Sequence, residues 1–173
     1  LNPTSGSYTT HGSDVAIVMQ PTDVDRSVPI TEQDVVRMAR YPRLGFFRPF
    51  GAEDRAAVDA AMERLEIDDL ARRQLHHLSG GQRQRAFVAQ GLAQQAPILL
   101  LDEPLIGLDV RSRSIIVDTI DAEKTAGRTT VTTTHSFDDA SRCDLVLLLA
   151  TRIVAFGSPE EVLTEEHLQA AFG

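Results

Sequence analysis

The fold class of this chain is decided by residues Ile98–Pro104, which read ILLLDEP. Four successive apolar residues predict a strand that is buried in a parallel sheet. The strand ends in two carboxylates, Asp102 and Glu103, at the edge of that sheet. An aspartate in this place can help to hold Mg²⁺, and the next acid can orient or deprotonate a water molecule. The alternative interpretation is a pair of solvated loop acids.

Helices and strands alternate on both sides of this strand. Such alternation predicts an α/β fold with a parallel sheet flanked by helices. The predicted strands are Val15–Met19, Ile98–Leu101, Thr129–Thr134, Leu145–Leu149 and Arg152–Phe156. The predicted helices around them are Ser79–Gln94, Val110–Thr125, Phe137–Arg142, Pro159–Leu163 and Glu165–Phe172.

A helical region is expected between the first two strands. Apolar residues recur at helical spacing in Val35–Ala39 and Glu53–Leu65, and Asp69–Arg73 is expected to form one more short helix. The two prolines and the glycine of Tyr41–Pro49 predict a loop. The chain is therefore expected to be one domain, with helices inserted at about residues 21–95 and a core formed by residues 1–20 and 96–173.

Composition and charge argue against several classes of protein and of site. The chain has 173 residues and a net charge of −8, which argues against a sequence-independent grip on nucleic acid. Its apolar runs are far shorter than the ~20 residues that span a bilayer. Cys143 is the only cysteine, which excludes intrachain disulfides and cysteine-cluster zinc sites. Lys124 is the only lysine, so any step that needs a lysine of this chain must use it.

The segment Leu78–Arg85, LSGGQRQR, carries a second signal. Ser79 can cap a helix, and Gln82 completes a capping box. Gly80 and Gly81 leave the first backbone N–H groups accessible, and such a helix N-terminus can hold phosphate. An ordinary capped helix is the alternative.

A third signal is His135, which follows the predicted strand Thr129–Thr134. A histidine at this place can donate to a phosphate oxygen or hold a water molecule, although a lone histidine is more often structural. Ser79 precedes Asp102 by 23 residues, and His135 follows it by 33, in each case one helix plus one strand. All three can therefore lie along the carboxyl edge of one sheet, where α/β proteins bind ligands.

Taken together, these motifs resemble the nucleotide-binding subunit of ABC transporters, a P-loop NTPase fold with a RecA-like core. The ABC signature is matched by Leu78–Gln82, and the Walker B strand with its catalytic glutamate by Ile98–Glu103. The D-loop is matched by Gly107-Leu108-Asp109 and the switch histidine by Thr134-His135. The end of the Q-loop strand is matched by Ile17–Gln20.

The resemblance implies ATP and Mg²⁺ as cofactors, with Asp102 and Gln20 holding the Mg²⁺. It implies that Glu103 is the general base and that His135 clamps the γ-phosphate. Two such subunits pair head to tail in this family, so Ser79, Gly80, Gly81 and Gln82 would contact ATP on the partner subunit. Asp109 would link the two sites. The helical region would receive a membrane permease, which places the protein at the cytoplasmic face of the membrane.

A narrower resemblance is to the branch that imports manganese, zinc or iron. It rests on segments around Val24-Asp25, Pro29-Ile30-Thr31, Arg40–Phe47 and Val154–Leu163. None of these segments has the spacing of a metal-ligand set. His76-His77 is an adjacent pair, which favours a surface position over a metal site.

The P-loop of the family, G-x-x-x-x-G-K-[ST], does not occur in the 173 residues. Lys124 follows the Walker B strand and has no glycine loop before it. We therefore expect that the P-loop precedes residue 1 and that this chain alone is inactive. The alternatives are a non-catalytic remnant or interaction module, and an ABC ATPase outside transport.

Overall fold

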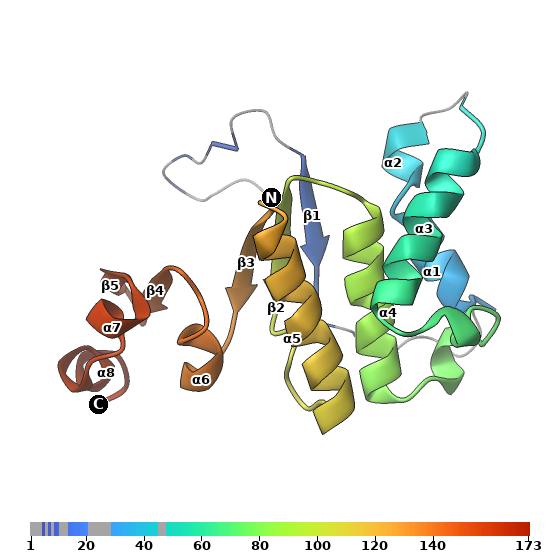
Figure 1. Ribbon diagram of the computed structural model, residues 1–173. Helices are drawn as coiled ribbons and strands as arrows, with labels where there is room; N and C mark the ends of the chain where they lie inside the picture. The colour runs from blue at the N-terminus through green and yellow to red at the C-terminus, as the bar shows by residue number, and fades with distance from the viewer. Residues whose placement is uncertain (1–4, 6, 8, 11–13, 21–28, 45–47) are drawn as a thin grey trace. The chain divides into compact units, whose positions relative to one another are not determined.

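The computed structural model describes residues 5, 7, 9, 10, 14–20, 29–44 and 48–173. The chain divides into two compact units, Leu1–Thr133 and Thr134–Gly173. Each unit is built from its own strands and helices (Figure 1).

The first unit contains a three-stranded parallel sheet. Its strands, in their order across the sheet, are β1 (Val15–Val18), β2 (Ile98–Asp102) and β3 (Thr129–Thr133). The register pairs Val18 with Leu101, and Asp102 with Thr133. The carboxyl ends of all three strands therefore meet at one edge, which confirms the parallel α/β arrangement for these strands.

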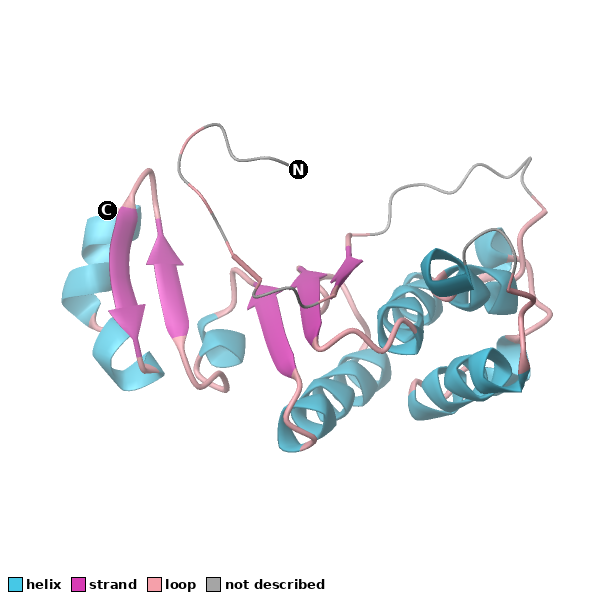
Figure 2. Ribbon diagram, turned by 90° about the horizontal axis from the view of Figure 1, so that it is seen from above, coloured by secondary structure: helices cyan, strands magenta, loops and turns pink. Residues whose placement is uncertain are grey.

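Helices pack on one face of this sheet. Helix α4 (Gly80–Ala93) contacts β1 and β2, and α5 (Val110–Thr125) contacts β3 (Figure 2). Leu99 and Leu101 are buried, whereas Ile17 and Val131 are 61% and 51% exposed. Leu100 is half-buried. The β2 strand is thus fully buried on one face only, because the described helices cover that face.

The close approach of α4 to the sheet depends on Gly91. A Cβ atom on Gly91 would lie 2.4 Å from Cγ2 of Val18 and 3.0 Å from Cδ1 of Leu99. A side chain at position 91 would therefore have to displace the side chains of Val18 and Leu99. Glycine at position 91 thus allows α4 to pack closely against β1 and β2.

All the regular elements described between β1 and β2 are helical. They are α1 (Glu32–Met38), α2 (Tyr41–Leu44), α3 (Ala52–Arg64), the 3₁₀ turns η1 (Asp68–Leu70) and η2 (Leu75–His77), and α4. Helix α1 begins with the capping box that its sequence indicates, since Thr31 Oγ1 accepts the Asp34 N–H and Asp34 Oδ2 accepts the Thr31 N–H. The assignment of residues 21–95 to a separate subdomain stays a prediction.

The loop expected at Tyr41–Pro49 is wrong in its first part, where α2 forms. Pro42 lies in the first turn of α2, where the missing N–H leaves no helical hydrogen bond unmade. Residues 45–47 of the expected loop lie outside the described residues.

The helix expected at Asp69–Arg73 is also wrong in its extent. The 3₁₀ turn η1 ends at Leu70, and the chain then forms turns. The carbonyl groups of Ala71 and Arg73 accept the N–H groups of Gln33 and Glu32, which begin α1. These carbonyl groups are thus bonded to α1, which competes with a continuing helix.

A buried ion pair joins three helices of the first unit. Arg40 Nε donates to Asp54 Oδ1 at 3.0 Å, and both side chains are at most 1% exposed. Arg40 also donates to the Ala93 carbonyl group at 3.0 Å and to Gln95 Oε1 at 2.9 Å. The ends of α1 and α4 are thereby tied to the start of α3.

Glu32, the first residue of α1, is a buried carboxyl group. It is 0% exposed, and neither carboxylate oxygen has a hydrogen-bond partner among the described residues. Burial raises the pKa of Glu32 to about 7, and the nearby Asp69 and Asp68 act in the same direction. Arg85 opposes this rise. Because of this pKa, the buried carboxyl group changes between its protonated and its charged form near neutral pH.

The second unit contains a two-stranded antiparallel sheet. Its elements are α6 (Phe137–Ala140), β4 (Val146–Leu149), β5 (Ile153–Gly157), α7 (Pro159–Val162) and α8 (Glu165–Phe172). Leu147 pairs with Phe156 across the two strands. The expected parallel arrangement is wrong for these strands, because only residues 150–152 connect them and a parallel crossover needs a dozen or so.

Candidate functional site

Two acidic residues lie at the carboxyl end of β2. Asp102 is the last residue of the strand and is exposed, and Glu103 follows it and is half-buried. Glu103 has a φ of 45°, in the left-handed region that L side chains rarely adopt. Such conformations cost about 1–3 kcal/mol and gather at functional sites. The backbone therefore turns sharply at the acid that the sequence singled out.

Thr133, at the end of β3, contacts both of these residues. Its hydroxyl group donates to Asp102 Oδ1 at 2.6 Å and accepts the Glu103 N–H at 3.0 Å. Thr133 belongs to the predicted strand Thr129–Thr134, but the sequence predicted no role for its side chain. A hydroxyl residue at the end of the strand next to β2 is the sequence signal that could have predicted this role for Thr133.

The N-terminus of α4 has the capped form that the sequence predicted. Ser79 Oγ accepts the Gln82 N–H at 3.2 Å, and Gln82 Oε1 accepts the Ser79 N–H at 3.0 Å. Ser79 and Gly80 are exposed, and a Cβ atom on Gly80 would meet nothing within 4 Å. The start of this helix, at Ser79 and Gly80, is therefore open to a ligand.

Gly81, one residue further on, lies against the start of α5. A Cβ atom on Gly81 would lie 2.3 Å from Ser112 Oγ and 2.6 Å from Asp109 Oδ2. The two helices thus approach each other through a glycine at α4 and two polar side chains at α5. The predicted Gly81 and Asp109 are brought together within one chain, while Ser112 was missed.

Asp109 is the N-cap of α5. Its Oδ1 accepts the Ser112 N–H at 2.9 Å, and its Oδ2 accepts the Ser112 hydroxyl at 2.8 Å. These two bonds hold the pKa of Asp109 below its usual value. The carboxylate therefore stays charged, at the helix end where negative charge is favoured.

The remaining predicted residues follow the other two strands. Gln20 lies two residues after β1 and is exposed. His135 lies exposed at the start of the second unit, just before Ser136, the N-cap of α6. Its position at the same sheet edge stays a prediction.

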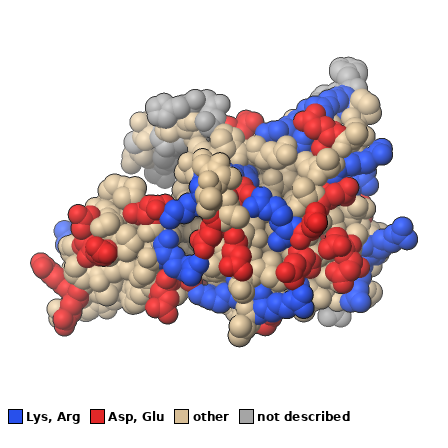
Figure 3. All heavy atoms as spheres, viewed as in Figure 1, with Lys and Arg blue, Asp and Glu red and all other residues tan. Residues whose placement is uncertain are grey.

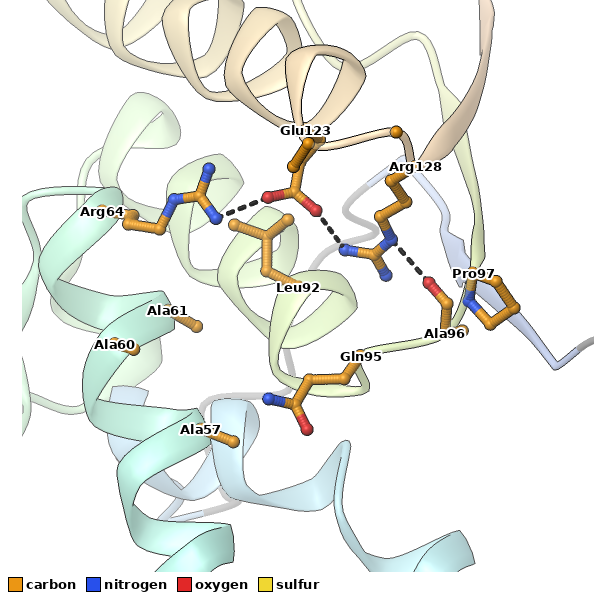
Figure 4. A pocket seen from close by; sticks show the side chains of 12 residues that line it. Ala57, Ala60, Ala61, Arg64, Leu92, Gln95, Ala96, Pro97, Glu123 and Arg128 are labelled. Atoms are coloured by element: carbon orange, nitrogen blue, oxygen red, sulfur yellow. Dashed lines mark hydrogen bonds and ion pairs between the residues drawn. The ribbon is translucent and has the colours of Figure 1, made fainter.

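A hollow of about 400 Å³ lies among the described residues, and none of the predicted site residues lines it (Figure 4). Small side chains of α3 line it together with the ends of α4 and α5. Glu123 accepts from Arg64 and from Arg128 across this hollow, and Arg128 Nε donates to the Ala96 carbonyl group at 2.6 Å. The charged side chains of this hollow are bonded to each other or to the backbone. We therefore interpret the hollow as the junction of α3, α4 and α5.

The surface carries charged side chains of both signs on the face that Figure 3 draws. Acidic and basic side chains are interspersed there. Within the described ranges, no group of three or more His, Cys, Asp or Glu side chains could hold a metal ion. None of the described helices is long and apolar enough to cross a bilayer.

The sheet edge therefore combines a carboxylate pair with a neighbouring hydroxyl group, and the same unit presents a glycine-containing helix N-terminus. This combination is typical of α/β domains that handle the phosphates of a nucleotide.

Comparison with known proteins identifies the family. The sequence model described as "ABC transporter" matches residues 1–106. The manganese transport system ATP-binding protein MntB of Listeria innocua is 38% identical over 160 residues, which are 92% of this chain and 67% of that protein. The chelated iron transport system membrane protein YfeB of Yersinia pestis is 38% identical, over 92% of this chain and 54% of that protein.

Structural similarity agrees with this result. A solved ABC transporter, described as of the metal-chelate type and in an inward-facing conformation, superposes with a TM-score of 0.83 at 28% identity. The superposition covers 92% of this chain and 64% of that one. The chain belongs to the ABC transporter ATP-binding family. It spans about half to two thirds of the length of the relatives named here.

Proposed function

We propose that the protein containing this chain binds and hydrolyses ATP as a subunit of an ABC transporter that imports a metal ion. The observation that carries the proposal is the Asp102–Glu103 pair, held at the carboxyl edge of a parallel sheet with Glu103 in a left-handed conformation. Family membership and the names of the manganese and chelated iron relatives support it.

The residues at the edge fit a magnesium ion with bound nucleotide. Mg²⁺ prefers oxygen ligands and needs only one or two from the protein. Asp102 offers an exposed carboxylate, with Oδ1 already bonded to Thr133, and Gln20 offers an exposed amide oxygen. Asp102 and Gln20 would hold the ion, whose charge offsets that of the phosphates.

Glu103 is the proposed general base. Its carboxylate would accept a proton from the water that attacks the γ-phosphate, so that the oxygen of this water forms the new bond to phosphorus as the bond to ADP breaks. His135 would donate a hydrogen bond to a γ-phosphate oxygen.

The N-terminus of α4 is proposed to act on a second subunit. Gly80 and Gly81 would present N–H groups and Ser79 its hydroxyl group to the ATP of the partner. Gln82 would hold Ser79 in place through the capping box. Asp109 would lie between the two sites. In a head-to-tail pair each subunit completes the site of the other, which gives two equivalent sites. The membrane permease is the other proposed partner, at the cytoplasmic face of the membrane.

The transported metal is proposed to be manganese or iron. Both metals occur in the names of the relatives above, whereas zinc stays a prediction from the sequence.

This chain is proposed to bind ATP weakly when it is alone. The 173 residues contain no G-x-x-x-x-G-K-[ST] sequence. Their one lysine, Lys124, lies exposed near the end of α5. Isothermal calorimetry of the 173-residue chain with Mg-ATP is expected to give no binding at micromolar nucleotide, and clear binding there would contradict this statement.

The function itself is tested by replacing Glu103 in the full-length protein, with its permease in lipid vesicles. Glu103→Gln is expected to retain ATP binding and to lower turnover by about 10²–10⁴-fold, since the base is lost and the shape is kept. Glu160→Gln, at an exposed position of α7, is the matched control. Normal turnover by Glu103→Gln would remove the assigned base, and no hydrolysis by the unsubstituted protein would refute the ATPase.

A further inference from the structure

One hydroxyl group joins the two acids of the proposed site. Thr133 and Asp102 are direct neighbours in the register of β3 and β2. Thr133 Oγ1 lies 2.6 Å from Asp102 Oδ1, to which it donates, and 3.0 Å from the Glu103 nitrogen, whose proton it accepts. The group thus uses its one donor and one of its two acceptor positions on adjacent residues of the same strand end.

These two bonds restrain different degrees of freedom. The bond to Asp102 fixes the rotation of a carboxylate that is otherwise exposed to solvent. The bond to the Glu103 amide fixes the peptide that enters the residue with a φ of 45°. A backbone in that region persists only where its surroundings hold it. The direction of the Glu103 side chain is therefore set in part by β3.

We propose that Thr133 is a positioning residue for hydrolysis: its hydroxyl group holds the Asp102 carboxylate and the Glu103 backbone in the orientation that the reaction uses. The kinetic half of this inference rests on the proposed function, whereas the hydrogen bonds stand on geometry alone. Thr133 itself touches neither water nor nucleotide in this role.

The strand supplies well-matched variants. Thr133→Val keeps the branched shape and removes the hydroxyl group, and Thr133→Ser keeps the hydroxyl group. Thr129 lies on the same strand and face and is also exposed, and its hydroxyl group makes no hydrogen bond with another described residue. Thr129→Val is therefore the same chemical change without the loss of a bond.

Two measurements on the full-length protein test the inference. The first is amide hydrogen exchange followed by NMR, in which Thr133→Val should speed the exchange of the Glu103 amide about tenfold, while Thr129→Val leaves it unchanged. The second is steady-state ATP hydrolysis. Thr133→Val should lower kcat about tenfold with less than about a twofold change in KM, and Thr133→Ser should restore kcat.

The outcomes separate the inference from the function. An unchanged exchange rate of the Glu103 amide overturns the hydrogen-bond basis. Faster exchange with unchanged kcat overturns the positioning role, and so does an equal loss of kcat in Thr129→Val. Absence of hydrolysis in the unsubstituted protein overturns the proposed function, and the exchange rates then still decide whether the hydroxyl group of Thr133 holds Glu103.

Discussion

Replacing the buried Glu32 by glutamine should remove a pH dependence from the stability of the fold. The folded protein holds this carboxyl group at a pKa of about 7, against an ordinary value of 4.5. The folded state therefore binds more protons than the unfolded state between these two values. By linkage, the stabilisation is greatest below about pH 4.5 and is lost as the pH rises through 7.

The size of the effect follows from the same difference. It corresponds to at most about 3 kcal/mol over the whole range, of which about 2 kcal/mol lies between pH 5.5 and 8.5. The physical source is the burial of a carboxylate without a hydrogen-bond partner, which Arg85 offsets only in part. In Glu32→Gln the side chain is neutral at every pH, so this contribution is absent.

The assay is urea unfolding followed by circular dichroism at pH 5.5, 6.5, 7.5 and 8.5. The difference in unfolding free energy between the wild type and Glu32→Gln should change by about 2 kcal/mol from pH 5.5 to 8.5, in favour of the variant at high pH. Glu63→Gln removes an exposed glutamate of α3 and should follow the wild type. A constant difference between the wild type and Glu32→Gln across the series would falsify the reasoning.

Two further predictions concern packing. Asp54→Ala should cost about 3–5 kcal/mol in urea unfolding, because the buried Arg40 loses the carboxylate bonded to its Nε and keeps only the exposed Glu53 at 3.8 Å. Arg40→Met/Asp54→Ala should cost less than Asp54→Ala, and the opposite order would contradict the argument from buried charge. Gly81→Ala should cost about 1–3 kcal/mol in stability, because the added Cβ atom overlaps with Ser112. Gly80→Ala should change stability by less than about 0.5 kcal/mol, because its Cβ atom meets nothing. Equal melting temperatures of the two variants would show that Gly81 does not lie close to Ser112.

The sequence predicted the elements whose signals are local. Three of these elements depend on residues within a few positions of each other. They are the apolar run that becomes β2, the Ser79–Gln82 capping box and the end of α5 before Gly127. Gly127 has a φ of 81°, as a residue that ends a helix often does. Patterns of this kind are visible in one sequence because they act within one turn or one strand.

The parallel sheet was predicted, but individual side-chain contacts between distant parts of the chain were not. Thr133 meets Asp102 across 31 residues, and no periodicity fixes the register that brings them together. The contact of Gly81 with Ser112 depends likewise on how two helices pack. Pro42 misled the local interpretation, since a proline in a first turn and a proline in a loop look alike in sequence.

Two of the three glycines of α4, Gly81 and Gly91, lie in close contact with other elements, and this has a consequence for how the helix can move. At Gly91 the helix lies against Val18 and Leu99 with no side chain of its own between them, and we take this close contact as the pivot of a tilt. Gly81 is ten residues away, and at about 1.5 Å per residue this gives a lever arm of about 15 Å. A tilt of about 4° therefore displaces Gly81 by about 1 Å. Because Gly81 lies directly on Ser112, a tilt toward α5 must push the start of that helix, and Asp109 with it.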